Sequence, residues 1–82
     1  MFITFKSRKS PYDVKTIQMN DTSTVMELKL KIHEVEGLAP NLQQLQICRT
    51  NDAPKVLRNM DHATVTDAGI QSGDRLYVGL NI

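Results

Sequence analysis

The 82-residue sequence contains no tryptophan, a single cysteine, and only two Tyr and two Phe. The lone thiol of Cys48 excludes an internal disulfide and favours a reducing compartment, so we expect a cytoplasmic or nuclear protein. So few aromatic rings offer little surface on which nucleic-acid bases can stack. The ten Lys and Arg residues against nine Asp and Glu give a formal charge of +1. Neither nucleic acid nor an anionic membrane is therefore an expected partner.

Long apolar runs are also missing. No segment approaches the roughly 20 apolar residues that span a bilayer, and the N-terminal MFITFKSRKS lacks the apolar core of a signal peptide. Apolar residues make up 40% and charged residues 23%, which is ordinary for a globular domain. A chain of this length supports one compact core. We expect a single domain over residues 1–82, suited to stand at the start of a larger adaptor protein.

Alternation of apolar and polar residues predicts strands near both ends of the chain and in its middle. The first two strands flank a turn predicted over residues 7–12 and form a hairpin. The residues expected to face the core are Met1, Ile3 and Phe5, then Ile17 and Met19, then Leu45 and Ile47, and finally Leu76, Val78 and Leu80.

The second strand leaves one question open. If its alternation continues backwards without interruption, Lys15 faces the core and Val14 faces outwards. A β-bulge would exchange the two residues. The sequence does not decide between these alternatives.

A helix is predicted from about residue 25 to residue 36. Thr24 and Glu27 form a capping box, which satisfies two backbone donors at a helix start. Gly37 supplies the left-handed residue that ends a helix, and Pro40 prevents its continuation. The predicted apolar stripe consists of Val25, Leu28, Ile32 and Val35.

The remaining segments complete an α+β pattern. We predict a polar loop over residues 50–55, a short strand at Val56 and Leu57, and a capped turn at Thr64–Asp67. A single helix crossing a mixed β-sheet buries both the helix stripe and the strand faces. The prediction is a β-grasp fold with one helix and a short 3-10 turn.

Residues 29–45, KLKIHEVEGLAPNLQQL, resemble the ubiquitin pattern K-x-K-I-x-x-x-E-G-x-x-P-x-x-Q-x-L. Met1–Ile3 and Lys6 match the first strand of ubiquitin, and Thr64–Asp67 falls in step with a later element. The chain is thus identified as a divergent member of the ubiquitin-like superfamily, with insertions in three loops. This resemblance implies the ubiquitin-like β-grasp fold, whereas a fold alone does not fix a function.

Ubiquitin is joined to its targets through a carboxyl-terminal Gly-Gly. Here the last segment, Leu76–Ile82, carries no such pair. The resemblance therefore implies a domain that is not conjugated as written. The alternative is a ubiquitin-like modifier whose Gly-Gly tail lies beyond residue 82.

Ubiquitin receptors recognise an aliphatic patch made of a Leu, an Ile and a Val. The resemblance places Arg8, Gln46 and Gly79 at those positions. Each buried aliphatic side chain contributes about 1.5–3 kcal/mol to an interface. We therefore expect ordinary ubiquitin receptors to bind this chain poorly.

Polar and basic residues take the place of that patch. They favour docking of a protein partner with an acidic or polar surface, because Tyr and Arg are frequent interface anchors. The alternative is a solvated face whose charges prevent aggregation. The predicted partner-binding residues are Lys6, Arg8, Gln46, Arg49, Tyr77 and Gly79.

Catalysis, cofactors and metals are not expected. A cysteine enzyme would need Cys48 beside a histidine, whereas His33 is predicted on the outer side of the helix and His62 in a loop. Two histidines and one cysteine without close spacing also make a poor metal site. The sequence therefore predicts a non-enzymatic interaction domain.

Overall fold

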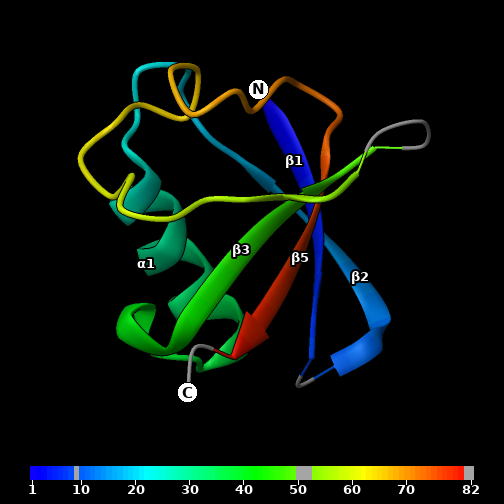
Figure 1. Cartoon of the computed structure of the whole chain (residues 1–82). Helices are drawn as coiled ribbons and strands as arrows, with labels where there is room; N and C mark the ends of the chain where they lie inside the picture. Colours follow the sequence, from blue (N-terminus) through cyan, green and yellow to red (C-terminus); the bar gives the residue numbers. More distant parts are fainter. Residues whose placement is uncertain (9, 50–52, 81–82) are drawn as a thin grey trace.

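The computed structural model describes residues 1–8, 10–49 and 53–80, and contains a five-stranded sheet in the order β2-β1-β5-β3-β4. One α-helix and a short 3-10 helix complete the fold (Figure 1). The elements are β1 (Phe2–Ser7), β2 (Ser10–Gln18), α1 (Val25–Glu36), η1 (Pro40–Leu42), β3 (Gln43–Cys48), β4 (Lys55–Val56) and β5 (Arg75–Leu80).

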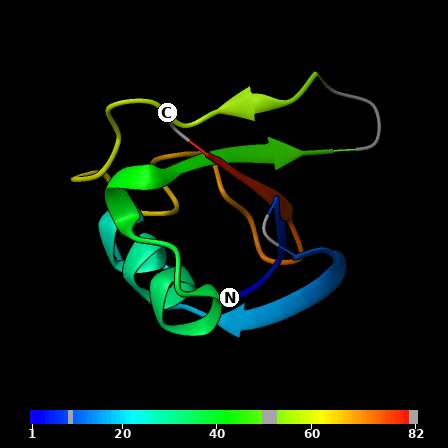
Figure 2. The same cartoon turned by 90° about the horizontal axis from the view of Figure 1, so that it is seen from below.

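The strand β5 lies in the middle of the sheet. It pairs in parallel with β1 and antiparallel with β3, while β1 and β2 form an antiparallel hairpin. Figure 2 shows α1 lying against one side of this curved sheet and leaving the other side uncovered. This arrangement is the predicted ubiquitin-like β-grasp fold, and the mixed pairing follows from the parallel contact of β1 with β5.

The predicted capping signals determine both ends of α1. The Thr24 hydroxyl accepts from the Glu27 N–H at 3.2 Å, and a Glu27 carboxylate oxygen accepts from the Thr24 N–H at 3.3 Å. At the other end Gly37 is left-handed, with φ of 73°. The helix therefore has the predicted bounds. At 12 residues it is too short to cross a bilayer, and no other helix in the described part of the chain could do so.

The predicted apolar stripe of the helix is wrong in its last member. Val25, Leu28 and Ile32 are fully buried, but Val35 is 43% exposed. The inward face continues four residues after Ile32, at Glu36, which is 6% exposed. An α-helix has 3.6 residues per turn, so Glu36 lies more nearly in line with the buried stripe than Val35 does.

The direction in which Lys15 and Val14 of β2 point is now defined. Lys15 pairs with Phe5 and therefore shares its inward face, whereas Val14 is 60% exposed. The irregular register lies between Phe5 and Ser7, nearer the hairpin end, and does not change which of the two side chains faces inwards. The strand also begins at Ser10, so the turn predicted over residues 7–12 is too long.

Several later predictions are confirmed with small shifts. The short strand is Lys55–Val56 rather than Val56 and Leu57. Lys55 therefore belongs to this strand and not to the predicted loop. Residues 50–52 of that loop lie outside the described residues. The Thr64 hydroxyl accepts from the Asp67 N–H at 3.0 Å, which confirms the capped turn. The 3-10 helix itself is at Pro40–Leu42.

Candidate functional site

The uncovered side of the sheet carries a row of three predicted site residues. Tyr77 of β5 is paired with Lys6 of β1 on one side and with Gln46 of β3 on the other. Neighbours in register share a sheet face, so the three side chains form one continuous strip. Tyr77 and Gln46 are half-buried, and Lys6 is exposed.

This strip forms part of a hollow of about 820 Å³, which we call the outer groove. Arg49, at the end of β3, also lines it, so the structure brings together four of the six predicted residues. The outer groove is lined by Thr4, Phe5, Lys6, Val14, Gln46, Cys48, Arg49, Gly73, Arg75, Leu76 and Tyr77.

Arg75 and Val14 are lining residues that sequence reasoning missed. Arg75 is two residues before Tyr77 in the same strand, so the period of two already placed it on the same face. Val14 could be placed on the outer face only once Lys15 was known to point inwards, because the two neighbouring side chains point to opposite faces of the sheet. The signal for Arg75 was therefore present in the sequence, whereas the signal for Val14 was ambiguous.

Arg49 is held in place by Asp74. Its Nε and Nη2 donate to the two carboxylate oxygens at 3.1 and 2.7 Å, and Nη2 also donates to the Gly69 carbonyl at 2.7 Å. The hydrogen bonds from Arg49, assisted by one from the Gln71 N–H, lower the pKa of Asp74 despite its burial. Much of the Arg49 charge is therefore compensated from within the domain.

Arg8 and Gly79 do not line the outer groove. Arg8 is exposed at the turn after β1, where its N–H donates to the Val78 carbonyl at 2.9 Å. Gly79 is buried opposite Gln44. An added Cβ there would lie 3.6 Å from a Tyr77 ring carbon and 3.7 Å from the Gln44 carbonyl oxygen, which is ordinary contact. Packing within the domain does not require a glycine at this position.

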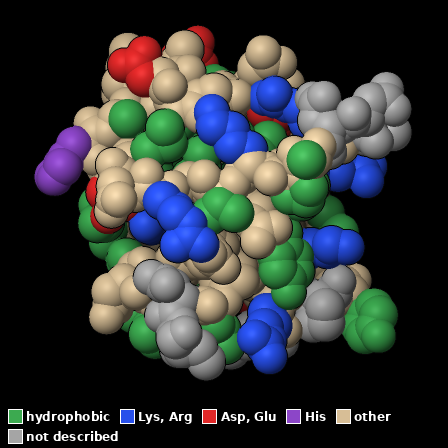
Figure 3. Space-filling model, viewed as in Figure 1, with side chains coloured by type: hydrophobic (Ala, Val, Ile, Leu, Met, Phe, Trp, Pro, Cys, Tyr) green, Lys and Arg blue, Asp and Glu red, His purple; other side chains and the backbone are tan. Residues whose placement is uncertain are grey.

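The outer groove is electropositive. Lys6, Arg49 and Arg75 line it, and within the described lining there is no Asp or Glu. Lys6 and Arg75 also have no ion-pair partner in the part of the chain that the structure describes. Figure 3 shows Lys and Arg side chains spread over the face seen in Figure 1, with Asp and Glu mainly at its upper end.

The residues considered for catalysis do not form a site. Cys48 is half-buried in the outer groove, whereas His33 is exposed on α1 and His62 is exposed in the loop after β4. Over residues 1–8, 10–49 and 53–80, no three His, Cys, Asp or Glu side chains are grouped so as to hold a metal ion.

Comparison with known proteins agrees with this fold. The model of the ubiquitin family matches residues 3–47, which is more than half of the chain. The chain belongs to the ubiquitin family.

Among solved structures, this ubiquitin-family domain is similar to the C-terminal ubiquitin-like domain of mouse tubulin-specific chaperone e. The TM-score is 0.83 at 18% sequence identity, covering 100% of this chain and 87% of that one. At this identity the likeness shows the fold alone. No curated protein matches the chain.

Proposed function

We propose that this ubiquitin-family domain is a non-catalytic interaction module that binds a protein partner through the uncovered face of its sheet. The predicted contact residues Lys6, Gln46, Arg49 and Tyr77 form the centre, with Arg8 and Gly79 beyond the groove. The observation that carries the proposal is the outer groove itself, with three cationic residues and no carboxylate in its described lining.

The charge of the groove favours an acidic partner. Lys6 and Arg75 lack carboxylate partners among the described residues, so an Asp or Glu of the partner adds an ion pair without breaking an existing one. Opposite charges across an interface accelerate association and select the partner. Arg49 contributes less to this attraction, because Asp74 already holds its guanidinium.

Tyr77 gives the same face an apolar centre. A half-buried Tyr offers a rigid ring and a polar tip, and such residues are frequent anchors in interfaces. Gln46 beside it replaces an aliphatic residue that ubiquitin receptors require. The combination supports an acidic or polar partner rather than an ordinary ubiquitin receptor.

A place within a larger cytoplasmic or nuclear adaptor is part of the proposal. The structurally similar mouse domain is itself the C-terminal part of a larger chaperone, so this fold serves there as one module of a longer protein. That precedent supports the adaptor role and gives no partner for the present chain.

Site-specific crosslinking tests the proposal. A benzoylphenylalanine replaces Gln46 in the centre of the outer groove or, as a control, Glu34 on the exposed side of α1. Crosslinking in cell extract should capture one protein from position 46 and not from position 34. The crosslinked peptide of that protein should contain Asp or Glu.

Two matched charge reversals complete the test. Lys6→Glu should weaken binding of the captured protein by about tenfold, since it places a carboxylate in the groove. Lys31→Glu makes the same change on the exposed side of α1 and should leave binding unchanged. Equal binding by both variants would show that the outer groove is a solvated face and not a docking site.

A further inference from the structure

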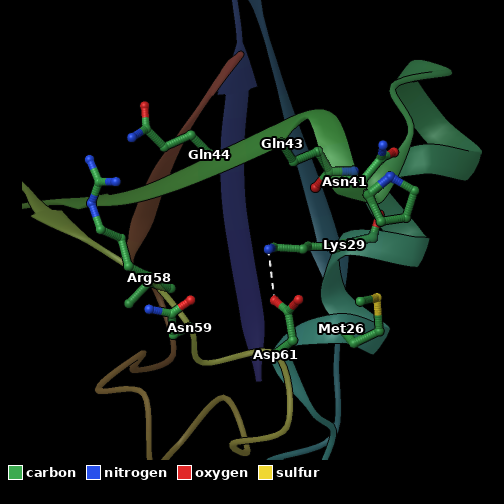
Figure 4. A pocket seen from close by; sticks show the side chains of 10 residues that line it. Met26, Lys29, Asn41, Gln43, Gln44, Arg58, Asn59 and Asp61 are labelled. Carbon is green, nitrogen blue, oxygen red and sulfur yellow. Dashed lines mark hydrogen bonds and ion pairs between the residues drawn. The ribbon is translucent and has the colours of Figure 1, made fainter. Parts of the chain in front are cut away.

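A second hollow of about 490 Å³ lies between α1, the start of β3 and the loop that follows β4 (Figure 4). We call it the helix pocket. Its volume is within the range typical of ligand sites, and none of its lining residues also lines the outer groove. Its position on a different part of the surface makes it independent of the proposed docking face.

Gln43 supplies a buried acceptor in the wall of this pocket. Its amide nitrogen donates to the carbonyl oxygens of Lys29 and Leu38, each at 2.8 Å. Because both of those contacts need a donor, the amide cannot be turned around. Its oxygen is left buried and has no hydrogen-bond partner among the described residues. A buried acceptor without a donor is costly, so this wall is suited to receive an N–H group.

The charges of the helix pocket leave one cation uncompensated. Lys29 and Asp61 form an ion pair at 2.7 Å, shown by the dashed line in Figure 4, and neutralise one another. Arg58 is exposed at the rim, and the described part of the chain provides no ion-pair or hydrogen-bond partner for its guanidinium. A ligand that carries a carboxylate can therefore pair with Arg58 while the Lys29–Asp61 bond stays intact.

Three further side-chain amides surround the opening. Asn41, Gln44 and Asn59 line the pocket, and their amides make no hydrogen bond within the described residues. Figure 4 shows Gln44, Arg58 and Asn59 along one side, with Asn41 on the other. Each primary amide offers both donor and acceptor, which matches the peptide group of a polypeptide backbone. Asn59 is also left-handed, with φ of 56°.

We propose that the helix pocket binds a short acidic peptide segment of a protein partner. Its carboxylate pairs with Arg58, and its peptide groups bond to the amides of Asn41, Gln44 and Asn59. One donor, an N–H of the peptide or an O–H of a water that the bound peptide holds, reaches the Gln43 oxygen. Met26 and Leu57 provide apolar walls for the neighbouring side chain.

Selection from a random pentapeptide library displayed on phage tests this inference. The whole domain is the bait, and peptides that also bind the Arg58→Glu variant are removed. Selected peptides should share an Asp or Glu, and replacing that residue by Asn or Gln should abolish binding. In an NMR titration, the peptide should shift the side-chain amide signals of Asn41, Gln44 and Asn59.

Charge variants test whether the peptide binds at the helix pocket or elsewhere on the domain. Arg58→Glu should weaken peptide binding by at least about tenfold, and the uncharged Arg58→Gln should give a smaller loss. Lys31→Glu and Lys6→Glu, which lie outside the helix pocket, should bind as the wild type does. An amide NMR spectrum of each variant checks its fold.

Three outcomes would overturn the proposal. One is a selection that yields no peptide discriminating wild type from Arg58→Glu. Another is a set of discriminating peptides that lack an acidic residue. In the third, inorganic sulfate shifts the pocket signals and no peptide does, which would make the pocket a simple anion site. None of these outcomes affects the outer groove, because Lys6→Glu tests that face separately.

Discussion

The Lys15 ammonium lies 2.6 Å from a carboxylate oxygen of Glu36 and so joins β2 to the last turn of α1. The Ser7 hydroxyl donates to the other oxygen of this carboxylate at 3.2 Å. The Glu36 side chain is 2% exposed and that of Lys15 is 29% exposed. A carboxylate buried to this degree needs such partners, so the inward Lys15 and the inward Glu36 depend on each other.

Replacing Lys15 by Met should lower the midpoint of urea unfolding, because it removes the ammonium group that pairs with the buried Glu36 carboxylate. The hydrogen bond to Glu36 raises the pKa of Lys15 above its ordinary value of 10.5. The ion pair therefore stabilises the fold fully below pH 10.5, and this contribution is lost as pH rises through the raised pKa.

Urea unfolding between neutral pH and pH 11 measures both effects. The wild type should lose stability at the alkaline end more steeply than Lys15→Met. Lys31→Met serves as the control, since Lys31 is exposed and makes no ion pair within the described residues. Identical unfolding midpoints for the two variants would contradict a stabilising role for Lys15.

Asp74→Asn should destabilise the domain by about 2 kcal/mol, because hydrogen bonds to a charged group contribute more than neutral ones. Arg49 lowers the pKa of Asp74 below its ordinary value of 3.8. The stabilisation by the Arg49–Asp74 ion pair is therefore complete above the ordinary pKa of Asp74 and is lost as pH falls through its lowered pKa. Thermal unfolding from neutral pH to about pH 2 should show a steeper loss of stability in the wild type than in Asp74→Asn. A parallel decline in both proteins would contradict it.

The inward face of α1 is tested by two alanine variants. Ile32→Ala should lower the free energy of unfolding by about 3 kcal/mol, since Ile32 is fully buried and its loss leaves a cavity. Val35→Ala should change it by no more than about 0.5 kcal/mol, since Val35 is on the surface. Chemical denaturation gives both free energies of unfolding. A large loss of stability for Val35→Ala would show that Val35 belongs to the buried stripe.

Gly79→Ala should raise stability by about 0.5 kcal/mol, because glycine weakens a strand and the added Cβ meets only ordinary contacts. The same variant separates two roles for this glycine. A stabilised variant that binds the crosslinked partner less well would place Gly79 against the partner, whereas unchanged binding would remove it from the interface. Denaturation and a binding assay on the same sample provide the two measurements.

Local signals in the sequence were sufficient for the helix and for the order of the elements. The Thr24–Glu27 capping box and Gly37 act within a few residues of each other, so their effect is visible without the fold. The alternation of the strands likewise identified their inward faces, except at Lys15 and Val14 of β2. The resemblance of residues 29–45 to ubiquitin then connected these elements into the observed fold.

Side-chain partners from distant parts of the chain could not be predicted in this way. Arg49 and Asp74 are 25 residues apart, so nothing local indicates that Asp74 holds the predicted docking residue. Lys15 faces inwards because Glu36 and Ser7 are there to receive it, and only the packed structure brings the three together. The helix pocket is likewise formed by three separate segments.

The position of β5 has a consequence for how the domain assembles. This strand follows all the other elements in the chain, yet it lies between β1 and β3. Until residues 75–80 have been synthesised, the β1–β2 hairpin and the β3–β4 pair have no shared strand to join them. Contacts between such distant segments slow folding. The five-stranded sheet can therefore be completed only after residues 75–80 have left the ribosomal exit tunnel.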